Sequence, residues 1–145
     1  MPSIAHEIKI SAPASAVYKA LTAVPDIQGW CAPVVAHPTG AATAQRGDVI
    51  DMSFGPDKDF KWEFVHLVPD RHVGWRCLAG PDDAPGTGVA FDLAETGDGR
   101  TSVSLEHKGW TDGHPEFVRC NTRWGALLGQ LKHYLEQGAT QKAVA

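Results

Sequence analysis

Three of the seven histidines, His6, His66 and His107, fall in segments where polar and apolar residues alternate. Each takes the phase of its apolar neighbours, and alternate residues of a strand point to the same face of a sheet. The alternation therefore predicts that all three face an apolar interior. A neutral histidine there could hydrogen-bond a carbonyl or hydroxyl group of a ligand, or act as a general base near neutral pH. A core histidine satisfied by a backbone carbonyl or a tyrosine hydroxyl is the more frequent outcome.

A zinc site built from these histidines would need all three nitrogens within about 2.1 Å of one ion. Their spacing along the chain does not require this arrangement, so the sequence predicts neither a metal site nor a cofactor. The chain also contains no G-x-G-x-x-G segment, no Walker loop and no G-x-S-x-G segment.

The five tryptophans are the second candidate group. Trp62 and Trp75 take the inward phase of two successive predicted strands, and Trp124 lies on the apolar side of a predicted helix. Trp30 and Trp110 come at turns where the mouth of a cavity would open. Indole rings can line a pocket for an apolar or aromatic ligand, each offering a π face and one N–H donor. They can equally fill the core, which is the interpretation we favour for Trp124.

A cysteine and two arginines are the remaining reactive or charged candidates. Cys120 could be a nucleophile with His107 as its base, but no acid is placed to orient the histidine, and an isolated buried cysteine is usually inert. Arg76 and Arg123 could each hold a carboxylate through paired hydrogen bonds, yet their phases predict that both face solvent. No pair of carboxylates takes an inward phase. We therefore assign no catalytic residue.

Composition restricts the class of protein. A chain of 145 residues corresponds to one domain, expected to span residues 1–145, and a net charge of −4 with scattered basic residues offers no surface for nucleic acid. The three cysteines, Cys31, Cys77 and Cys120, are widely spaced, which favours reduced thiols. The first residues lack a basic segment followed by an apolar one, and no apolar run is long enough to span a membrane. We therefore expect a cytoplasmic protein.

The elements that would position these residues follow from periodicity. Residues 4–10 alternate as a strand, and Pro13 and Pro25 each suit the first turn of a short helix. Proline cannot donate to a sheet, so Pro33 and Pro38 are expected to bracket an edge strand. Further runs of period two, separated by glycine, proline and aspartate, cover residues 50–54, 60–68, 73–77, 89–93 and 103–107. The short connections predict antiparallel hairpins in a seven-stranded sheet with one apolar face.

The last element is expected to cover that apolar face. A helix is predicted from Pro115 to about Gln137, with Gly138 ending it and a frayed tail over residues 139–145. At about 100° per residue, its apolar residues share one side: Phe117, Cys120, Trp124, Leu127, Leu128, Leu131, Tyr134 and Leu135. Polar residues of the same helix are expected to point elsewhere: Arg119, Arg123, Gln130, His133 and Gln137. A long helix across a curved sheet can leave a hollow between the two.

This order of elements resembles the helix-grip fold of the START-like superfamily, also called SRPBCC. Several segments are similar to its branch homologous to the activator of a heat-shock chaperone ATPase (AHSA-type). They are Ile10 to Thr22 with Trp30 after it, Phe64 to Arg71, and Thr101 to Trp110 followed by Trp124 and Leu131 to Gly138. The resemblance covers nearly the whole chain.

The resemblance implies an α+β helix-grip fold, in which a seven-stranded curved antiparallel sheet wraps around the long C-terminal helix. It also implies a cavity between the two, and we expect this cavity to bind a small hydrophobic molecule, aromatic or lipid-like, oriented by His107 and indole N–H groups. Two alternatives stay open. One is a small cyclase or hydrolase with His107 as its base, and the other is a regulatory module for a chaperone ATPase. The protein could be a monomer or a homodimer.

The predicted ligand-binding residues are those that strand phase, helix phase or a turn places at this cavity. They are Trp30, Met52, Phe54, Trp62, Phe64, His66, Trp75, Phe91, His107, Trp110, Phe117, Cys120, Asn121 and Trp124.

Overall fold

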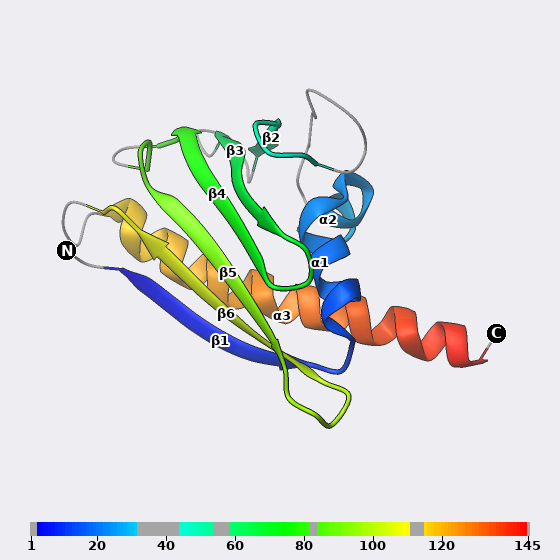
Figure 1. Cartoon of the computed structure of the whole chain (residues 1–145). Helices are drawn as coiled ribbons and strands as arrows, with labels where there is room; N and C mark the ends of the chain where they lie inside the picture. Colours follow the sequence, from blue (N-terminus) through cyan, green and yellow to red (C-terminus); the bar gives the residue numbers. More distant parts are fainter. Residues whose placement is uncertain (1–2, 32–43, 54–58, 82–83, 111–114, 145) are drawn as a thin grey trace.

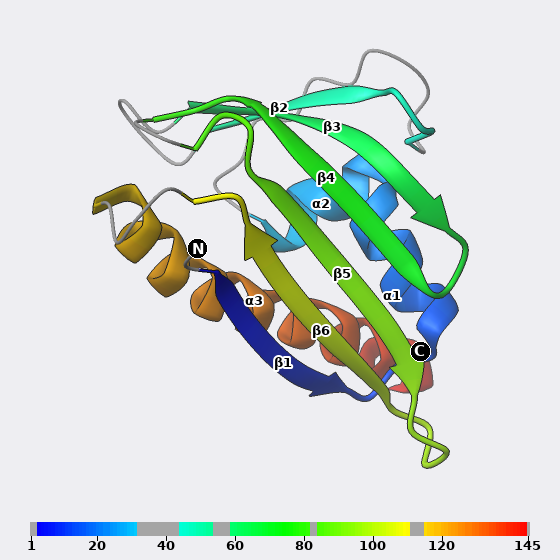
Figure 2. The ribbon, with the colours of Figure 1, turned by 60° about the vertical axis from the view of Figure 1, so that its left-hand side comes forward.

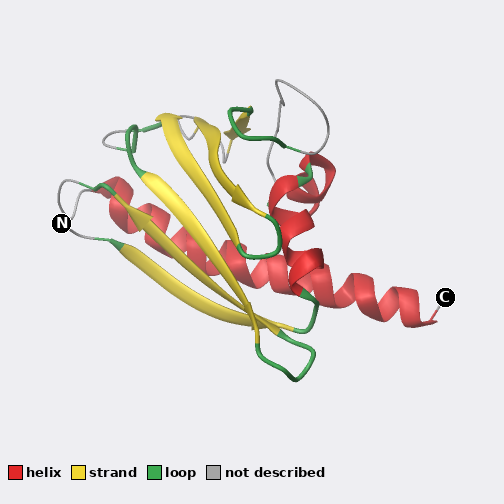
Figure 3. Ribbon diagram, in the orientation of Figure 1, coloured by secondary structure: helices red, strands yellow, loops and turns green. Residues whose placement is uncertain are grey.

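The computed structural model describes residues 3–31, 44–53, 59–81, 84–110 and 115–144. Its elements are β1 (Ile4–Ile10), α1 (Ala14–Thr22), α2 (Val24–Trp30), β2 (Val49–Ser53), β3 (Asp59–Val68), β4 (His72–Ala79), β5 (Gly88–Glu95), β6 (Thr101–Lys108) and α3 (Pro115–Val144). Figure 1 and Figure 3 show a single sheet with α3 lying along one of its faces and the short helices near one end.

The sheet has the strand order β1-β6-β5-β4-β3-β2, with antiparallel neighbours throughout. From β2 to β6 each strand pairs with the next, which is the meander that the short connections predicted. β1 pairs with β6, where Ile4 stands opposite His107 and Ile10 opposite Thr101. The described residues contain six strands rather than the predicted seven, because the edge strand expected between Pro33 and Pro38 lies outside them.

One face of the sheet is apolar and turned toward α3. On β6, Thr101, Val103, Leu105 and His107 are buried, and the residues between them are half-buried. Figure 2 shows the sheet bent over α3, with β1 running beside the helix. Among the strands, β1 is the one that the α3 backbone approaches most closely. Toward β3 and β4 the sheet and the helix diverge, so large side chains are needed to fill the space between them.

β3 departs from strict alternation at Val65. Phe64 stands opposite Trp75 and His66 opposite Gly74, so Val65 is an extra residue on β3 and forms a β-bulge. The extra residue reverses the phase of the rest of the strand, because side chains alternate from one residue to the next. His66 is consequently exposed on the outer face. The prediction that it faces the interior is wrong, since counting by twos assumes that no bulge interrupts the strand.

α3 buries the stripe predicted for it. Five residues of this apolar stripe are at most 5% exposed, namely Cys120, Trp124, Leu127, Leu128 and Leu131. The helix continues through Gly138 to Val144, so the predicted end is wrong. A glycine inside a helix costs only about 1 kcal/mol relative to alanine, and no proline follows to stop the helix. The frayed tail expected at 139–145 stays a prediction. No helix in the described part of the chain is both long and apolar enough to cross a membrane.

The short helices complete the core beside α3. α1 packs against β4, β5 and α3, and α2 packs against α1 and α3. Trp30, predicted at the mouth of the cavity, is instead a core residue with 1% exposure, and its Nε1–H donates to the carbonyl oxygen of Ala20 at 2.7 Å. The Tyr134 hydroxyl donates to Asp26 Oδ1 at 2.5 Å, so α2 is tied to α3 as well as to α1.

Candidate functional site

An apolar hollow lies between the β2–β3 side of the sheet and the first half of α3. It is lined by Cys31, Met52, Phe60, Trp62, His107, Cys120, Arg123, Trp124 and Leu127. Its volume is only about 20 Å³, room for one water molecule, whereas pockets for small ligands usually measure roughly 300–1,000 Å³. The hollow is where the fold was expected to leave one, but side chains fill most of it.

Aromatic rings occupy the space between the sheet and α3. The ring centres of Trp62 and Trp75 are 5.9 Å apart, and those of Trp75 and Phe91 are 5.1 Å apart. The chain of contacts ends on the helix, where Trp124 lies 5.8 Å from Phe91. At the other end Phe60 stacks on Trp62 at 5.8 Å. The rings are mostly tilted or edge-to-face, as aromatic pairs prefer, and they form a continuous layer from β3 to α3.

His107 is fully buried at the centre of a chain of hydrogen bonds. The Thr87 hydroxyl donates to the carbonyl oxygen of Ala84 at 2.6 Å, so its oxygen accepts from the Nε2–H of His107, at 2.7 Å. The Nδ1 atom of the neutral ring then carries the lone pair, and it accepts the Nε1–H of Trp124 at 3.1 Å. Both ring nitrogens are therefore satisfied by protein groups, and the network fixes the tautomer.

Burial lowers the pKa of His107 from 6.5 to about 3, so the ring is neutral at pH 7. A general base needs a lone pair within reach of the proton it removes and a pKa near the working pH. His107 has neither in this structure. It is a satisfied core histidine, with a threonine hydroxyl and an indole N–H as its partners in place of the expected backbone carbonyl or tyrosine hydroxyl.

A buried ion pair borders the hollow at the start of α3. Glu116 is fully buried, and its Oε2 lies 3.5 Å from Arg123 Nη1, while its Oε1 lies 3.1 Å from Arg119 Nη1. The Arg123 guanidinium lies over the Phe60 ring, 5.6 Å from its centre. The prediction that Arg123 faces solvent is therefore wrong. Helical spacing could have indicated the pairing, because residues 116, 119 and 123 share one side of a helix, but it does not indicate the burial.

The cysteines in the described residues are free and buried. Burial raises the pKa of Cys31, Cys77 and Cys120 to about 12 in each case. Cys120 Sγ also donates to Glu116 Oε2 at 3.3 Å, which further favours the protonated thiol. Because the thiolate is the reactive form, Cys120 is not an activated nucleophile.

Two buried indole N–H groups have no acceptor among the described residues, those of Trp75 and Trp110. Both rings pack against residues that line the hollow. The Trp110 ring lies 4.7 Å from the His107 ring, and the Trp75 ring lies 5.9 Å from Trp62. A buried donor left unpaired costs about 1–3 kcal/mol. The layer of rings is thus well packed but incompletely hydrogen-bonded.

The structure brings most of the predicted ligand-binding residues together. Those that line the hollow are Met52, Trp62, His107, Cys120 and Trp124. Those that pack in the core around them are Phe64, Trp75, Phe91, Trp110 and, half-buried, Phe117.

The other predicted residues lie elsewhere. His66 is on the outer face of the sheet, and Trp30 is buried between the short helices. Asn121 is exposed on α3, where its Oδ1 lies 2.9 Å from His6 Nε2. His6, His66 and His107 are thus in three different environments. Phe54 lies outside the described residues.

A curved antiparallel sheet that wraps around one long C-terminal helix is the helix-grip fold of the SRPBCC or START-like superfamily. Within it, a family model described as "Activator of Hsp90 ATPase homolog 1-like protein" matches residues 11–136. The chain belongs to this family. No curated protein compared with the chain matches it.

Comparison with solved structures also finds proteins of this fold. The Aha1 dimer from Colwellia psychrerythraea, solved in solution, is 30% identical to the chain, with a TM-score of 0.78 over 94% of this chain and 97% of that one. Protein MLL2253 from Mesorhizobium loti is 20% identical, with a TM-score of 0.77 over 94% and 98% of the two chains. CalU16 from Micromonospora echinospora is 22% identical, with a TM-score of 0.71 over 91% and 73%. The last two show likeness of fold alone.

Proposed function

We propose that the protein binds a small hydrophobic molecule, aromatic or lipid-like, between the sheet and α3. The observation that supports this most is that the indole N–H groups of Trp75 and Trp110 have no acceptor among the described residues, on rings that pack against residues lining an apolar hollow. A ligand that carries acceptor oxygens would recover the free energy that these donors forfeit when they are buried alone. The proposed ligand therefore has an apolar body with one or more carbonyl, hydroxyl or ether oxygens.

Entry of such a ligand requires side chains to move, because the hollow holds about 20 Å³. The wall most suited to this is formed by Phe60 and Arg123, on the side where the sheet diverges from α3. Moving them would give up a stacked ring pair and a cation–π contact, worth about 1–2 kcal/mol each, and the Arg123 guanidinium would have to move while keeping its ion pair with the buried Glu116. A ligand that buries about 300 Å² of apolar surface gains roughly 7 kcal/mol, which offsets that loss.

A thermal-shift screen with fatty acids, flavonoids and aromatic polyketides tests the proposal. A ligand that binds only the folded protein raises its melting temperature as its concentration rises. Cys31→Leu fills the hollow and is expected to reduce this rise, whereas Cys77→Leu enlarges a core residue that does not line the hollow. Each variant is compared with its own ligand-free melting temperature. The absence of a rise with every ligand, or an equal rise in both variants, would refute the proposal.

The family description favours a second candidate, a regulatory module that acts on a chaperone ATPase. The same relationship supports a homodimer, since the Colwellia psychrerythraea protein is described as a dimer. Mass measurement in solution and a chaperone ATPase assay, with and without added protein, test these two statements. The cyclase or hydrolase alternative stays a proposal, but His107 is not placed to act as its base, since both of its ring nitrogens are hydrogen-bonded to protein groups.

The proposed setting is the cytoplasm. The three cysteines in the described residues are unpaired thiols, as expected in a reducing compartment. We propose no nucleic-acid partner, because the net charge is −4 and the basic residues form no run.

A further inference from the structure

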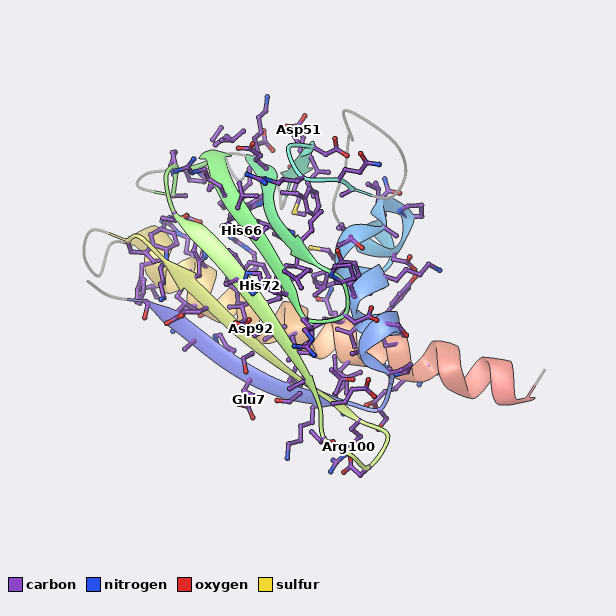
Figure 4. The ribbon with its side chains drawn as sticks, in the orientation of Figure 1. Glu7, Asp51, His66, His72, Asp92 and Arg100 are labelled. Carbon is purple, nitrogen blue, oxygen red and sulfur yellow. The ribbon has the colours of Figure 1, made fainter. Side chains whose placement is uncertain are left out.

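A second cavity lies on the outer face of the sheet, on the opposite side from α3. It is an open groove of about 470 Å³ over β3 to β6. Its floor is formed by small residues on neighbouring strands, including Gly74, Gly88 and Ala90, and two histidines, His66 and His72, stand along it. Figure 4 shows His66, His72 and Asp92 in succession across the face of the sheet turned away from α3. Nothing in the proposed inner site uses these residues.

The backbone places His66 in the groove by two features. The bulge at Val65 turns His66 from the inner to the outer face, and bulges commonly serve to redirect a side chain in this way. Gly74, its cross-strand partner, then leaves room for it. An ideal Cβ on Gly74 would lie 3.2 Å from His66 Cβ and 3.4 Å from its Cδ2. The imidazole of His66 therefore lies over the β4 backbone, on the same face as His72.

Asp92 fixes the orientation and tautomer of His72. Its Oδ1 lies 2.7 Å from His72 Nδ1. A carboxylate accepts only from a protonated nitrogen, so in the neutral ring Nε2 carries the lone pair. A carboxylate bound to the far nitrogen is the usual support of a metal-ligating histidine. The His66 and His72 rings face each other edge-on, with centres 6.1 Å apart.

We propose that His66 and His72 together bind one divalent late-transition-metal ion, Zn²⁺, Cu²⁺ or Ni²⁺, with Asp92 as the positioning residue for His72. Imidazole is a favoured ligand for these ions. Two imidazoles that share a tetrahedral zinc ion, with Zn–N bonds of about 2.1 Å, have ring centres about 5 Å apart. The rings here need to approach by about 1 Å, which a rotation of the exposed His66 side chain supplies.

Two histidines fill only part of the coordination shell of such an ion. The described residues bring no third histidine, cysteine or carboxylate into a group that could hold an ion. Water, or a donor atom of a molecule lying in the groove, would therefore complete the coordination. Two cationic side chains line the groove, Arg76 and Lys108, and Lys108 is paired with Glu106, with Nζ 3.1 Å from Oε1.

Calorimetric titration of the untagged full chain with ZnCl₂ and NiCl₂ tests the proposal. The wild type is expected to bind one ion per protein, and His66→Gln and His72→Gln each to lose this saturable binding. Asp92→Asn is expected to weaken it about 10- to 100-fold, as loss of a supporting carboxylate does elsewhere. Histidine signals in NMR spectra, followed in the same titration, identify the two rings that respond.

Two control variants separate this site from general attraction of cations. Glu7→Gln removes the same charge as Asp92→Asn from an exposed position on β1 without touching His72, and His133→Gln removes an exposed histidine on α3. Both are expected to bind as the wild type does. Binding that survives in the His66→Gln, His72→Gln double variant, or no saturable binding by the wild type, overturns the proposal. Equal weakening by Asp92→Asn and Glu7→Gln overturns the positioning role of Asp92.

Discussion

At the scale of single residues, His107 shows how a polar group is kept inside an aromatic core. Its ring contacts tryptophans, at 5.8 Å from Trp62 and 4.7 Å from Trp110, and both of its nitrogens have partners. A buried polar group with all its hydrogen bonds made costs little, while one that loses a partner costs about 1–3 kcal/mol. The histidine thus joins β6 to α3 through Trp124 and to the start of β5 through Thr87.

The depressed pKa of His107 predicts a loss of stability in mild acid. Above pH 6.5 the ring is neutral in both states. Between pH 6.5 and about 3, His107 is protonated in the unfolded chain but stays neutral in the folded protein. The free energy of unfolding therefore falls as pH falls, by about 1.4 kcal/mol per pH unit. His107→Gln can keep both hydrogen bonds and does not titrate. We expect the stability advantage of the wild type over His107→Gln to shrink by about 2 kcal/mol between pH 6.5 and pH 5.

Urea denaturation of both proteins at the two pH values measures this advantage, and taking the difference cancels the other titrating groups. A difference that stays constant, or that grows in acid, would show that the ring takes up a proton in the folded protein.

Trp124 and Trp110 differ in the hydrogen bonding of their indole N–H groups, so replacing each by phenylalanine should lower the free energy of unfolding by different amounts. Trp124→Phe removes a donor that is bonded and leaves His107 Nδ1 without a partner. Trp110→Phe removes a donor that has no acceptor among the residues that the structure describes. Both changes delete the same atoms from a buried site, so their packing costs are similar. We expect Trp124→Phe to destabilise by about 1–3 kcal/mol more than Trp110→Phe. Equal losses in chemical denaturation would contradict the described hydrogen bonds.

At the scale of elements, the contact between α2 and α3 depends on a glycine. An ideal Cβ on Gly29 would lie 2.6 Å from Tyr134 Cε1, and the Tyr134 ring is held by its bond to Asp26. We expect Gly29→Ala to destabilise the protein by about 1–3 kcal/mol, because the helices must move apart. Gly129→Ala is the matched control on α3. Its Cβ would meet nothing within 4 Å, and we expect it to stabilise by roughly 0.5–1 kcal/mol. Thermal denaturation in which both variants shift in the same direction would contradict this account.

The strands and the buried face of α3 can be predicted from the sequence because one face of each is buried, and burial imposes a period that can be counted. Phe60, Trp62 and Phe64 on β3 follow this period. His66 does not, since a bulge depends on the partner strand and leaves no mark in the local pattern.

Two features of α3 could not be predicted in this way. Gly138 does not end the helix, because the residues after it can continue one. The burial of Glu116 with Arg123 depends on where the first turn of α3 packs against the core. The sequence pattern of α3 alone does not indicate this position. The size of the hollow depends on the packing of rings from β3, β4, β5 and α3 together, so no segment alone could predict it.

At the scale of the whole molecule, the divergence of sheet and helix explains both the aromatic core and the proposed site. α3 lies close to β1 and farther from the strands at the opposite side, which leaves a wedge that only large side chains fill. Tryptophans fill this wedge, but each indole N–H group needs a hydrogen-bond acceptor. The apolar surroundings provide one for Trp124 and, among the described residues, none for Trp75 and Trp110. The outer face of the same sheet carries the separate histidine groove, so the two proposals can fail independently.

The most direct test monitors the indole N–H signals of a ¹⁵N-labelled protein while a hydrophobic ligand with acceptor oxygens, found by the thermal-shift screen, is added. The account predicts that the signals of Trp75 and Trp110 shift and exchange more slowly with water, because their N–H groups gain an acceptor. The signal of Trp30 is expected to stay unchanged, since its N–H is already bonded to Ala20. A ligand that binds while leaving the Trp75 and Trp110 signals in place would contradict a site between the sheet and α3.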